Sequence, residues 1–309
     1  MVSKPAICIT TYQREAQLAT LLSSLSTQSV KPYQVIITDN AASSSVATVV
    51  KQFADCLAIT LCHEQQQGVV HARNKCLESF LSSDADALVW IDDDEWPQHD
   101  DWLANLLKTQ MQTHADIVCS DVLSTPEDPS KQFLVHALYP KPMAQSQGEE
   151  VRFFYTNNTL LTRRVIEQVG MFDLRFNQTG SEDYDYCLRT KQLGFKIAYA
   201  QDAKVIELHP ESRSHLGWFA LRGIRLGQGA TRVMLKQHGL LKSILLTPIY
   251  SGYRFLDACR LALKALFCAD KGLGFAATLR FCSSFGTVLG LFGMKYAEYK
   301  PSEKTSLSE

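Results

Sequence analysis

The sequence predicts an α/β protein built on a mostly parallel, doubly wound sheet. Two observations lead to this prediction. Short apolar runs alternate with amphipathic segments along the first 122 residues, at the spacing of repeated strand–helix units. One of these runs, residues 87–91, is suited to burial on both faces and leads directly into four consecutive carboxylates at residues 92–95.

The individual elements follow from the same patterns. Apolar runs predict strands at residues 6–11, 33–39, 57–62, 87–91 and 116–122. Helical spacing of apolar residues predicts helices at 15–26, 46–53, 68–80 and 101–113. Prolines and polar residues make 124–150 a long loop. Beyond it we expect strands at 153–161, 196–199 and 203–207, and helices at 164–169, from Ser181 onward and at 216–237. Ser181 is expected to cap its helix, whose first turn is acidic.

The four acids after the strand at 87–91 indicate a cation site. Pro97 has no amide donor and ends strand pairing, and ligands of open α/β sheets bind beyond the carboxyl ends of the strands. Neighbouring carboxylates resist ionising together unless a cation is present. Such oxygen ligands favour Mg²⁺ or Mn²⁺, with substrate phosphates supplying further ligands. An acidic turn on the surface is the alternative.

The composition is that of an ordinary globular chain, with 46% hydrophobic and 20% charged residues over 309 positions. The nine cysteines are odd in number and form no C-x-x-C pair, which indicates reduced thiols in a cytoplasmic protein rather than disulfides or zinc. The chain runs from Met1 straight into its first predicted strand, so no signal peptide is expected.

Charge is distributed unevenly along the chain. The first 209 residues carry seventeen Lys and Arg against twenty-six Asp and Glu, whereas the remainder carries fourteen against six. A basic tail on an acidic body favours a phosphate-bearing partner or an anionic membrane surface. Nucleic acid is not expected as a partner, because no motif that reads it accompanies the charge.

Five motifs in a fixed order narrow the class. They are Thr10-Thr11-Tyr12-Gln13-Arg14, Asp39 at a strand end, Gly68 followed by Arg73-Asn74, the aspartates at 92–94, and Glu182-Asp183. The sequence has no glycine-rich dinucleotide fingerprint and no Walker lysine loop. From residue 4 to about 235 it resembles the inverting family 2 glycosyltransferases of the GT-A fold, with a weaker likeness at 286–299. The Ile-Asp-Asp-Asp-Glu-x-Pro form most resembles bacterial enzymes that build exopolysaccharide or lipopolysaccharide.

The resemblance implies a nucleotide-sugar donor, with UDP as the expected nucleotide. It implies that Thr10, Tyr12 and Arg14 line the nucleotide pocket. Asp39 would accept the imide hydrogen of the base, which a carboxylate can do, and Arg73 would meet the diphosphate. A loop cap for Asp39 and a solvated helical arginine for Arg73 are the alternatives.

The aspartates at 92–94 fit the D-x-D motif of the family. In one register Asp94 binds the metal and Asp92 lies nearer the ribose. Asp93 leaves this register open by one residue, because any of the three side chains could be the one that points into the site.

The resemblance also implies the catalytic and acceptor residues. Asp183 would be the general base, and Glu182 would orient the acceptor or the loop. His209 would complete the metal shell or bind phosphate, and Arg213 and Trp218 would lie near the acceptor. For Glu182 and Asp183 the alternative is that acids merely suit a helix N-terminus. For His209 it is a structural role, and for Arg213 and Trp218 it is helix packing.

Two other classes of protein stay open. A sugar nucleotidylyltransferase would want a glycine-rich basic loop after the first strand, and residues 10–14 lack it. A non-catalytic GT-A module for sugar binding or scaffolding could lose its metal and base carboxylates, whereas this chain retains both. The acceptor is expected to be a glycan or a lipid-linked sugar; loops set the donor sugar and the linkage.

The resemblance divides the chain into a catalytic domain at 1–235 and a basic helical tail at 236–309. Residues 239–267 mix apolar and basic side chains at helical spacing, and Pro248 is expected to kink or divide this helix. Residues 273–294 are long enough to span a bilayer, but Arg280, serines and glycines disfavour a span. We expect the tail to lie in the headgroup region on the cytoplasmic side. A hairpin packed on the catalytic domain, or a homodimer contact, is the alternative.

Overall fold

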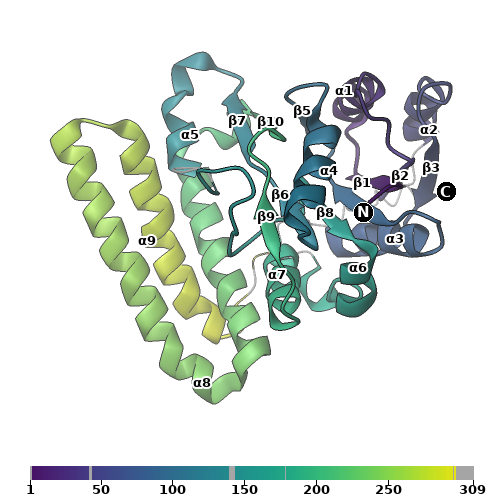
Figure 1. The fold of residues 1–309 in the computed structure, drawn as a ribbon. Coiled ribbons are helices and arrows are strands. Elements are labelled where there is room, and N and C mark those ends of the chain that lie inside the picture. The colour runs from purple at the N-terminus through teal and green to yellow at the C-terminus, as the bar shows by residue number, and fades with distance from the viewer. Residues whose placement is uncertain (1, 42–43, 139–142, 178, 295, 297–309) are drawn as a thin grey trace, which may run out of the picture.

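A seven-stranded sheet forms the centre of the computed structural model, which describes residues 2–41, 44–138, 143–177, 179–294 and 296 (Figure 1). Its strand order is β3-β2-β1-β4-β8-β6-β9. The strands are β1 (Pro5–Thr11), β2 (Gln34–Asp39), β3 (Ile59–His63), β4 (Ala87–Trp90), β6 (Ile117–Cys119), β8 (Thr159–Thr162) and β9 (Ile197–Tyr199). All neighbouring pairs are parallel except those of β8, which is antiparallel to β4 and β6.

The order of successive strands in the sheet reverses at β1. It pairs in parallel with β2 on one side and with β4 on the other. The connections that leave the carboxyl ends of β1 and β4 therefore diverge, which creates the crevice where open α/β sheets bind ligands. A smaller sheet adjoins this edge and has the order β5-β10-β7, from β5 (Glu95–Pro97), β10 (Val205–His209) and β7 (Val122–Pro126).

Helices cover both faces of the large sheet because consecutive residues of its strands are apolar, so that both faces are apolar. In β1, Ile7 and Ile9 join one buried cluster, whereas Ala6 and Cys8 join the other. The first cluster receives α1 (Glu15–Ser26), α2 (Ser44–Lys51) and α4 (Trp102–Thr113). The second receives α3 (Val69–Leu81), α6 (Arg163–Val169) and α7 (Glu182–Gln192).

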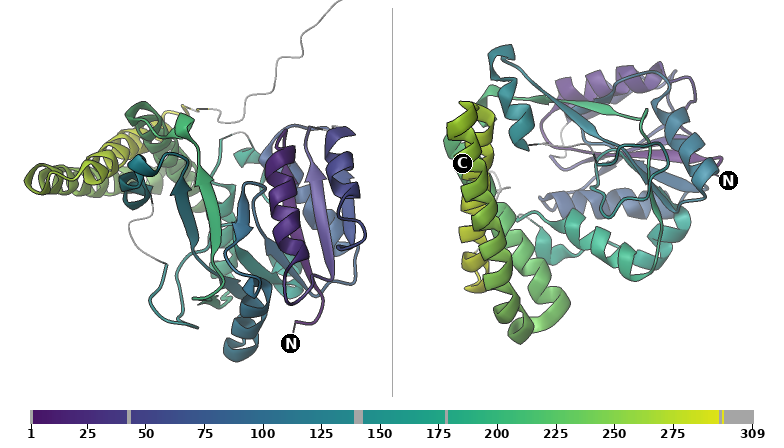
Figure 2. Two further views of the ribbon diagram at one scale, coloured as in Figure 1. Left: turned by 90° about the horizontal axis from the view of Figure 1, so that it is seen from above. Right: turned by 60° about the vertical axis from the view of Figure 1, so that its left-hand side comes forward.

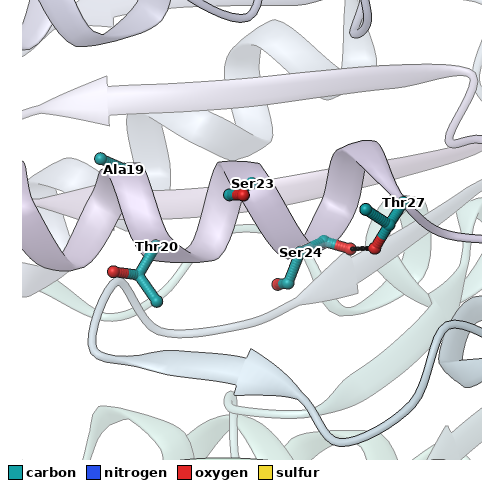
Figure 3. A pocket seen from close by; sticks show the side chains of 5 residues that line it. All are labelled: Ala19, Thr20, Ser23, Ser24 and Thr27. Carbon is teal, nitrogen blue, oxygen red and sulfur yellow. Dashed lines mark hydrogen bonds between the residues drawn. The ribbon is translucent and has the colours of Figure 1, made fainter.

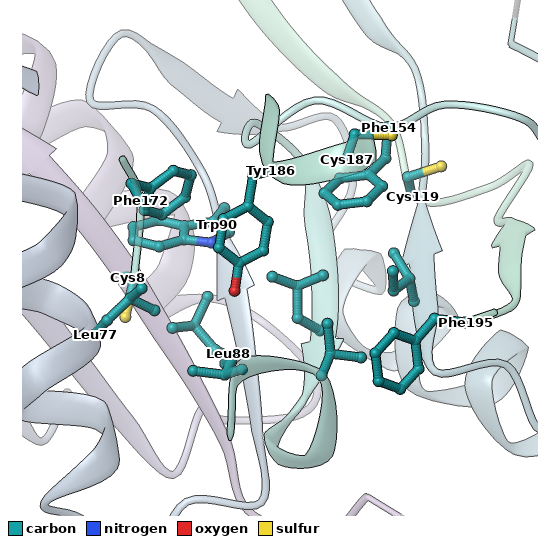
Figure 4. Packing of buried hydrophobic residues seen from close by; sticks show 14 of the residues in the cluster. Cys8, Leu77, Leu88, Trp90, Cys119, Phe154, Phe172, Tyr186, Cys187 and Phe195 are labelled. Carbon is teal, nitrogen blue, oxygen red and sulfur yellow. The ribbon is translucent and has the colours of Figure 1, made fainter. Parts of the chain in front are cut away.

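An aromatic group lies beneath the end of β4 (Figure 4). The ring of Phe172 meets Trp90 edge-on at 5.9 Å and stacks on Tyr186 at 4.4 Å between ring centroids. These side chains connect the strand that precedes the acidic run to the helix that carries Glu182 and Asp183. Such packing fixes the two segments relative to each other.

The predicted elements of the first 122 residues are confirmed, except that one strand is divided between two sheets. The strand expected at 116–122 is divided into β6 in the large sheet and β7 in the small one. The strand expected at 153–161 is wrong in its first half, because Asn158 takes a left-handed conformation (φ 47°) and β8 begins after it. The region 124–150, expected to be a loop, contains the end of β7, a 3₁₀ turn (Pro129–Lys131) and α5 (Phe133–Leu138). Residues 139–142 of that loop lie outside the described ranges.

The C-terminal region is a helical layer on one side of the molecule (Figure 2). Helix α8 (Leu216–Cys268) is followed by α9 (Lys271–Leu291), which folds back along α8 and packs closely on it because glycines line the contact. A Cβ on Gly223 would lie 2.4 Å from the carbonyl oxygen of Leu279. The expected division of the helix at Pro248 is wrong: the one non-helical residue within α8 is Gly239, whose φ of 73° suits glycine.

The predicted division at residue 235 falls within α8, shortly before Gly239. Among the helices that the structure describes, none is long and apolar enough to cross a membrane. Residues 297–309, which end the predicted tail and the region of weaker likeness, lie outside the described ranges.

Candidate active site

The acidic run after β4 alternates between buried and accessible side chains. Asp92 and Asp94 expose 36% and 22% of their side chains, whereas Asp93 exposes only 6%. Glu95 is buried because it belongs to β5, where it pairs with Glu207 of β10. Residues 92–94 form the turn between β4 and β5, and in this turn Asp92 and Asp94 are the two acids that solvent reaches.

Arg14 lies across the crevice from these acids. It follows β1 directly, and its Nη1 lies 2.9 Å from Asp93 Oδ1 and 2.7 Å from Asp94 Oδ2. The turn after β1 and the turn after β4 thus meet where the strand order of the sheet reverses. The residues of the first and fourth sequence motifs are brought together by this contact.

Arg73 connects the acidic run to the N-terminus of α7. This side chain of α3 is 7% exposed, so the alternative of a solvated arginine is wrong. Its Nη1 pairs with Glu182 Oε1, and its Nη2 lies 3.5 Å from Asp92 Oδ1. The motifs around residues 73, 92 and 182, far apart in the sequence, form one continuous set of ion pairs.

The carboxyls of this set are crowded and poorly hydrated. Although 36% of the Asp92 side chain is exposed, loss of hydration among the surrounding groups raises its pKa to about 7, against the opposing effect of Arg73 and with further increase from Asp94 and Asp93. Burial likewise raises the pKa of Asp93 to about 6 and that of Glu182 to about 7. A site with these raised values favours an added cation, which would stabilise the ionised forms.

The donor set suits a hard divalent cation, although the protein alone supplies few ligands. Asp92 and Asp94 present carboxylate oxygens, which Mg²⁺ and Mn²⁺ prefer. Within the described ranges, no three His, Cys, Asp or Glu side chains are grouped so that they could hold a metal ion by themselves. The residues therefore fit an ion whose remaining ligands come from substrate phosphates and water.

Asp39 and Tyr12 lie at the carboxyl ends of the neighbouring strands β2 and β1. Asp39 ends β2 and is fully buried; its Oδ1 accepts a hydrogen bond from the Ala41 amide, and its Oδ2 lies 3.6 Å from Nδ1 of His63. The amide bond is the loop cap considered as an alternative. The Tyr12 hydroxyl accepts a bond from Gln67 Nε2, which ties the β1 turn to the loop before α3. Thr10 is half-buried near the end of β1.

The start of α7 differs from the expected cap. Ser181 has φ 73°, and its side chain makes no capping hydrogen bond, so the prediction of a serine cap is wrong. Asp183 is half-buried, and its Oδ1 accepts a bond from the Tyr184 amide at 2.6 Å. Glu182 is buried beside it.

His209, which ends β10, forms a separate group with Arg213 and Trp218. His209 is 3% exposed, and burial lowers its pKa. Its Nε2 lies 3.1 Å from the carbonyl oxygen of Arg213. Since a carbonyl only accepts, Nε2 carries the hydrogen and Nδ1 carries the lone pair. The Trp218 ring meets the imidazole edge-on at 5.4 Å.

Two residues of the site were missed by the sequence analysis. Glu207 faces Glu95 across the small sheet and raises the pKa of Glu95, after burial and Asp92. Asn157 donates a hydrogen bond to Glu95 Oε1 at 2.9 Å. Glu95 in turn accepts from the Asp92 amide at 3.2 Å and so supports the backbone of the acidic run. Neither residue has a sequence signal, because the contact depends on strands that are distant along the chain.

A hollow on α1 is unrelated to this site (Figure 3). It is lined by Ala19, Thr20, Ser23 and Ser24 of that helix and by Thr27, which follows it. It offers no charged group and no convergence of elements, so it gives no basis for a functional site.

A central α/β sheet with acids at its switch point and a second acidic pair opposite is the arrangement of a GT-A glycosyltransferase. The family model described as glycosyl transferase family 2 matches residues 6–170. The chain is also 32% identical over 313 residues to the succinoglycan biosynthesis protein ExoM of Rhizobium meliloti (strain 1021), with 97% of each chain covered. The chain belongs to glycosyl transferase family 2, and the predicted family and enzyme class are confirmed.

Solved structures show the same fold at low sequence identity. The mannosyltransferase PcManGT of Pyrobaculum calidifontis, in complex with GDP-Man and Mn²⁺, is similar with a TM-score of 0.64 and 18% identity, over 96% of this chain and 89% of that one. S. aureus TarS 1-349 in complex with UDP-GlcNAc has a TM-score of 0.57 and 12% identity, with 90% of each chain covered. The predicted fold class is confirmed.

Proposed function

We propose that this enzyme transfers a sugar, with inversion, from a nucleotide-sugar donor to a hydroxyl of a glycan or lipid-linked acceptor in cell-surface polysaccharide synthesis. The observation that carries the proposal is the set of ion pairs from Arg14 through residues 92–94 to Arg73 and Glu182. Similarity to ExoM supports the pathway. The nucleotide-sugar complexes of two structural neighbours support the donor class, and UDP is our expected nucleotide.

The donor would lie in the crevice between β1 and β4. Thr10 and Tyr12 would line the nucleotide pocket, and Asp39 would accept the imide hydrogen of the base. The alternation of burial favours the register in which Asp94 binds the metal and Asp92 lies near the ribose. Asp93 would serve as the buried partner that fixes Arg14.

The chemistry is a single displacement at the anomeric carbon. The acceptor oxygen forms a bond to that carbon while the bond to the diphosphate oxygen breaks, and the acceptor proton passes to Asp183. General-base assistance of this kind contributes about 10²–10⁴-fold. A bound Mg²⁺ or Mn²⁺ would neutralise charge on the departing diphosphate. Arg73 would add a fixed positive charge there while it pairs with Glu182 at the start of α7.

The acceptor would approach from the side of α7 and α8. Arg213 and Trp218 would contact it, and His209, neutral and with its Nδ1 lone pair free of the Arg213 carbonyl, would bind phosphate through water or add a metal ligand. These three roles rest on the family resemblance and on their position after β10, next to the edge that carries Glu207.

The second half of α8 supports attachment to a membrane surface. One stripe of large apolar side chains at helical spacing is at least about two thirds exposed, namely Leu241, Leu245, Ile249, Tyr253 and Leu256. No described element of the chain covers it. Exposed Lys242 and Lys264 flank the stripe and would attract anionic headgroups. We propose that the enzyme lies on the cytoplasmic face of the membrane, close to a lipid-linked acceptor.

Flotation with vesicles tests this attachment. The wild type should float with vesicles that contain phosphatidylglycerol and not with pure phosphatidylcholine, and Leu245→Glu should abolish flotation. Leu193→Glu, which changes an exposed leucine at the end of α7, is the matched control and should float. A concentration-dependent dimer that Leu245→Glu dissolves, without vesicle binding, would assign the stripe to a second copy instead.

Release of nucleoside diphosphate tests the activity itself. The protein would be incubated with Mn²⁺ and a panel of UDP- and GDP-sugars, with and without membrane lipid extract as a source of acceptor. We expect UDP release from at least one UDP-sugar and none after Asp183→Asn. A protein that binds these donors and releases no diphosphate would be a sugar-binding module, and formation of pyrophosphate would indicate a nucleotidylyltransferase.

A further inference from the structure

The turn that leads into Glu182 and Asp183 has a strained backbone. Gly180 and Ser181 both take left-handed conformations, with φ of 74° and 73°. For a serine this conformation is uncommon, and such residues cost of order 1–3 kcal/mol each unless the surroundings fix them. Ser181 makes no capping hydrogen bond that would compensate locally. Contacts from elsewhere must therefore hold the turn in place.

One face of α8 supplies these contacts. Gly229 approaches so closely that a Cβ there would lie 1.9 Å from Ser181 Oγ and 3.0 Å from Ser181 Cβ. Arg232, nearly one turn later, donates hydrogen bonds to Thr179 Oγ1 and to the Arg175 carbonyl oxygen. The turn is thus bounded on one side by a helix backbone that admits no side chain and by a guanidinium.

Lys236 holds the first turns of α7 from the same face of α8. Its Nζ lies 2.6 Å and 2.8 Å from the two carboxylate oxygens of Asp185 and 2.7 Å from Asp173 Oδ2. Asp185 is fully buried, and its Oδ2 also accepts from Arg189 at 3.0 Å. A buried carboxylate depends on such partners, so Lys236 fixes α7 just beyond Asp183.

We propose that the segment 229–236 of α8 sets the position of Asp183, with Gly229 and Lys236 as positioning residues for the transfer reaction. Neither is placed in contact with substrate. They act by holding the strained turn and the first turns of α7 in the geometry that aims the Asp183 carboxylate at the acceptor hydroxyl. The inference rests on the proposed role of Asp183 as general base. It also makes α8 part of the catalytic machinery.

Gly229→Ala is the decisive variant, because the added methyl meets only the Ser181 side chain within ordinary contact distance. Alanine favours a helix over glycine by about 1 kcal/mol, so folding should be preserved. We expect kcat for UDP release to fall about 10- to 100-fold, because misplacement by about 1 Å has effects of this size. The donor KM and the affinity for UDP with Mn²⁺ should change less than about twofold. Gly252→Ala, in the same helix with no atom near the added methyl, is the matched control and should keep full kcat.

Two further variants separate positioning from a general structural role. Ser181→Gly removes the atoms that clash and suits a positive φ, so in the Gly229→Ala background it should restore most of the lost kcat. Lys236→Met should lower kcat with donor affinity retained, and Lys236→Arg should restore it. If Lys236→Met does not fold, the Gly229 and Ser181 pair decides the question alone.

The outcomes distinguish this inference from the proposed function. If Asp183→Asn is inactive while Gly229→Ala keeps wild-type kcat, the inference is wrong and the assignment of the base stands. It is equally wrong if Ser181→Gly fails to restore Gly229→Ala. Full activity of Asp183→Asn would overturn both. Loss of kcat in Gly229→Ala with its recovery by Ser181→Gly would support the inference.

Discussion

Replacement of Arg73 by methionine tests the electrostatic account of the site most severely. Arg73 is buried and pairs with Glu182 and Asp92. Burial raises the folded-state pKa of Glu182 from its ordinary 4.5 to about 7 even with this guanidinium present. Ionised Glu182 therefore opposes folding by about 3 kcal/mol at alkaline pH. Without Arg73 its pKa would rise further, since an uncompensated buried charge is strongly unfavourable.

The sign of the pH effect follows from the raised pKa. Stability associated with protonated Glu182 is fully present below pH 4.5 and is lost as pH rises through about 7. We expect Arg73→Met to lower the free energy of unfolding by about 3–5 kcal/mol near pH 8. Near pH 5 the loss should shrink to about 1–2 kcal/mol, because Glu182 is then protonated with or without the arginine.

Urea unfolding at these two pH values, with a chelator present, measures the difference. Lys75→Met is the matched control, because Lys75 lies on the same helix. Its Nζ lies 3.1 Å from Glu78 Oε2, and both side chains are exposed. It should change stability by less than about 0.5 kcal/mol at either pH. An equal loss for Arg73→Met at both pH values would refute the argument that Glu182 is the group that titrates.

Other predictions concern the donor side. Asp94→Asn should weaken Mn²⁺-dependent binding of UDP by at least about tenfold in calorimetric titration, while the melting temperature without metal stays within a few degrees because the lost pair with Arg14 is partly exposed; unchanged binding would exclude Asp94 as a ligand. Asp39→Asn should weaken UDP binding by about tenfold or more, since a charge-assisted hydrogen bond is lost, and should leave the Mn²⁺ requirement intact; equal binding by both proteins would contradict its contact with the base. In metal-free protein the melting temperature should rise as pH falls from about 8 to about 6, because the pKa values of Asp92 and Glu182 are raised. Mn²⁺ with UDP should stabilise the protein more at the higher pH. A melting temperature that does not change with pH would count against the account of crowded carboxylates.

The fold could be predicted because it depends largely on local patterns. Apolar runs predicted the strands around β1, helical spacing predicted the helices between them, and the acids after Trp90 predicted the edge on which the candidate site lies. The register of the D-x-D motif could not be predicted. It depends on Glu95 entering β5 and pairing with Glu207, more than a hundred residues away.

The remaining errors have similar physical causes. Ser181 was expected to cap a helix from its residue type, but the close approach of Gly229 accompanies a left-handed backbone that no local pattern indicates. Pro248 was expected to break the long helix, yet the break lies at Gly239. Asn158 interrupts the segment expected to be a strand, and its side chain bonds to Trp102 and to two backbone carbonyls. At Ser181 and Asn158 a tertiary contact outweighs a local preference.

The anomeric configuration of the first product tests the central claim most directly. The donor that the wild type consumes would be followed by proton NMR from the start of the reaction, before the released sugar equilibrates in water. A single displacement with Asp183 as base predicts a product of the opposite anomeric configuration to the donor, and Asp183→Asn should form none of it while it still binds UDP with Mn²⁺. A product that retains the configuration of the donor would contradict the account.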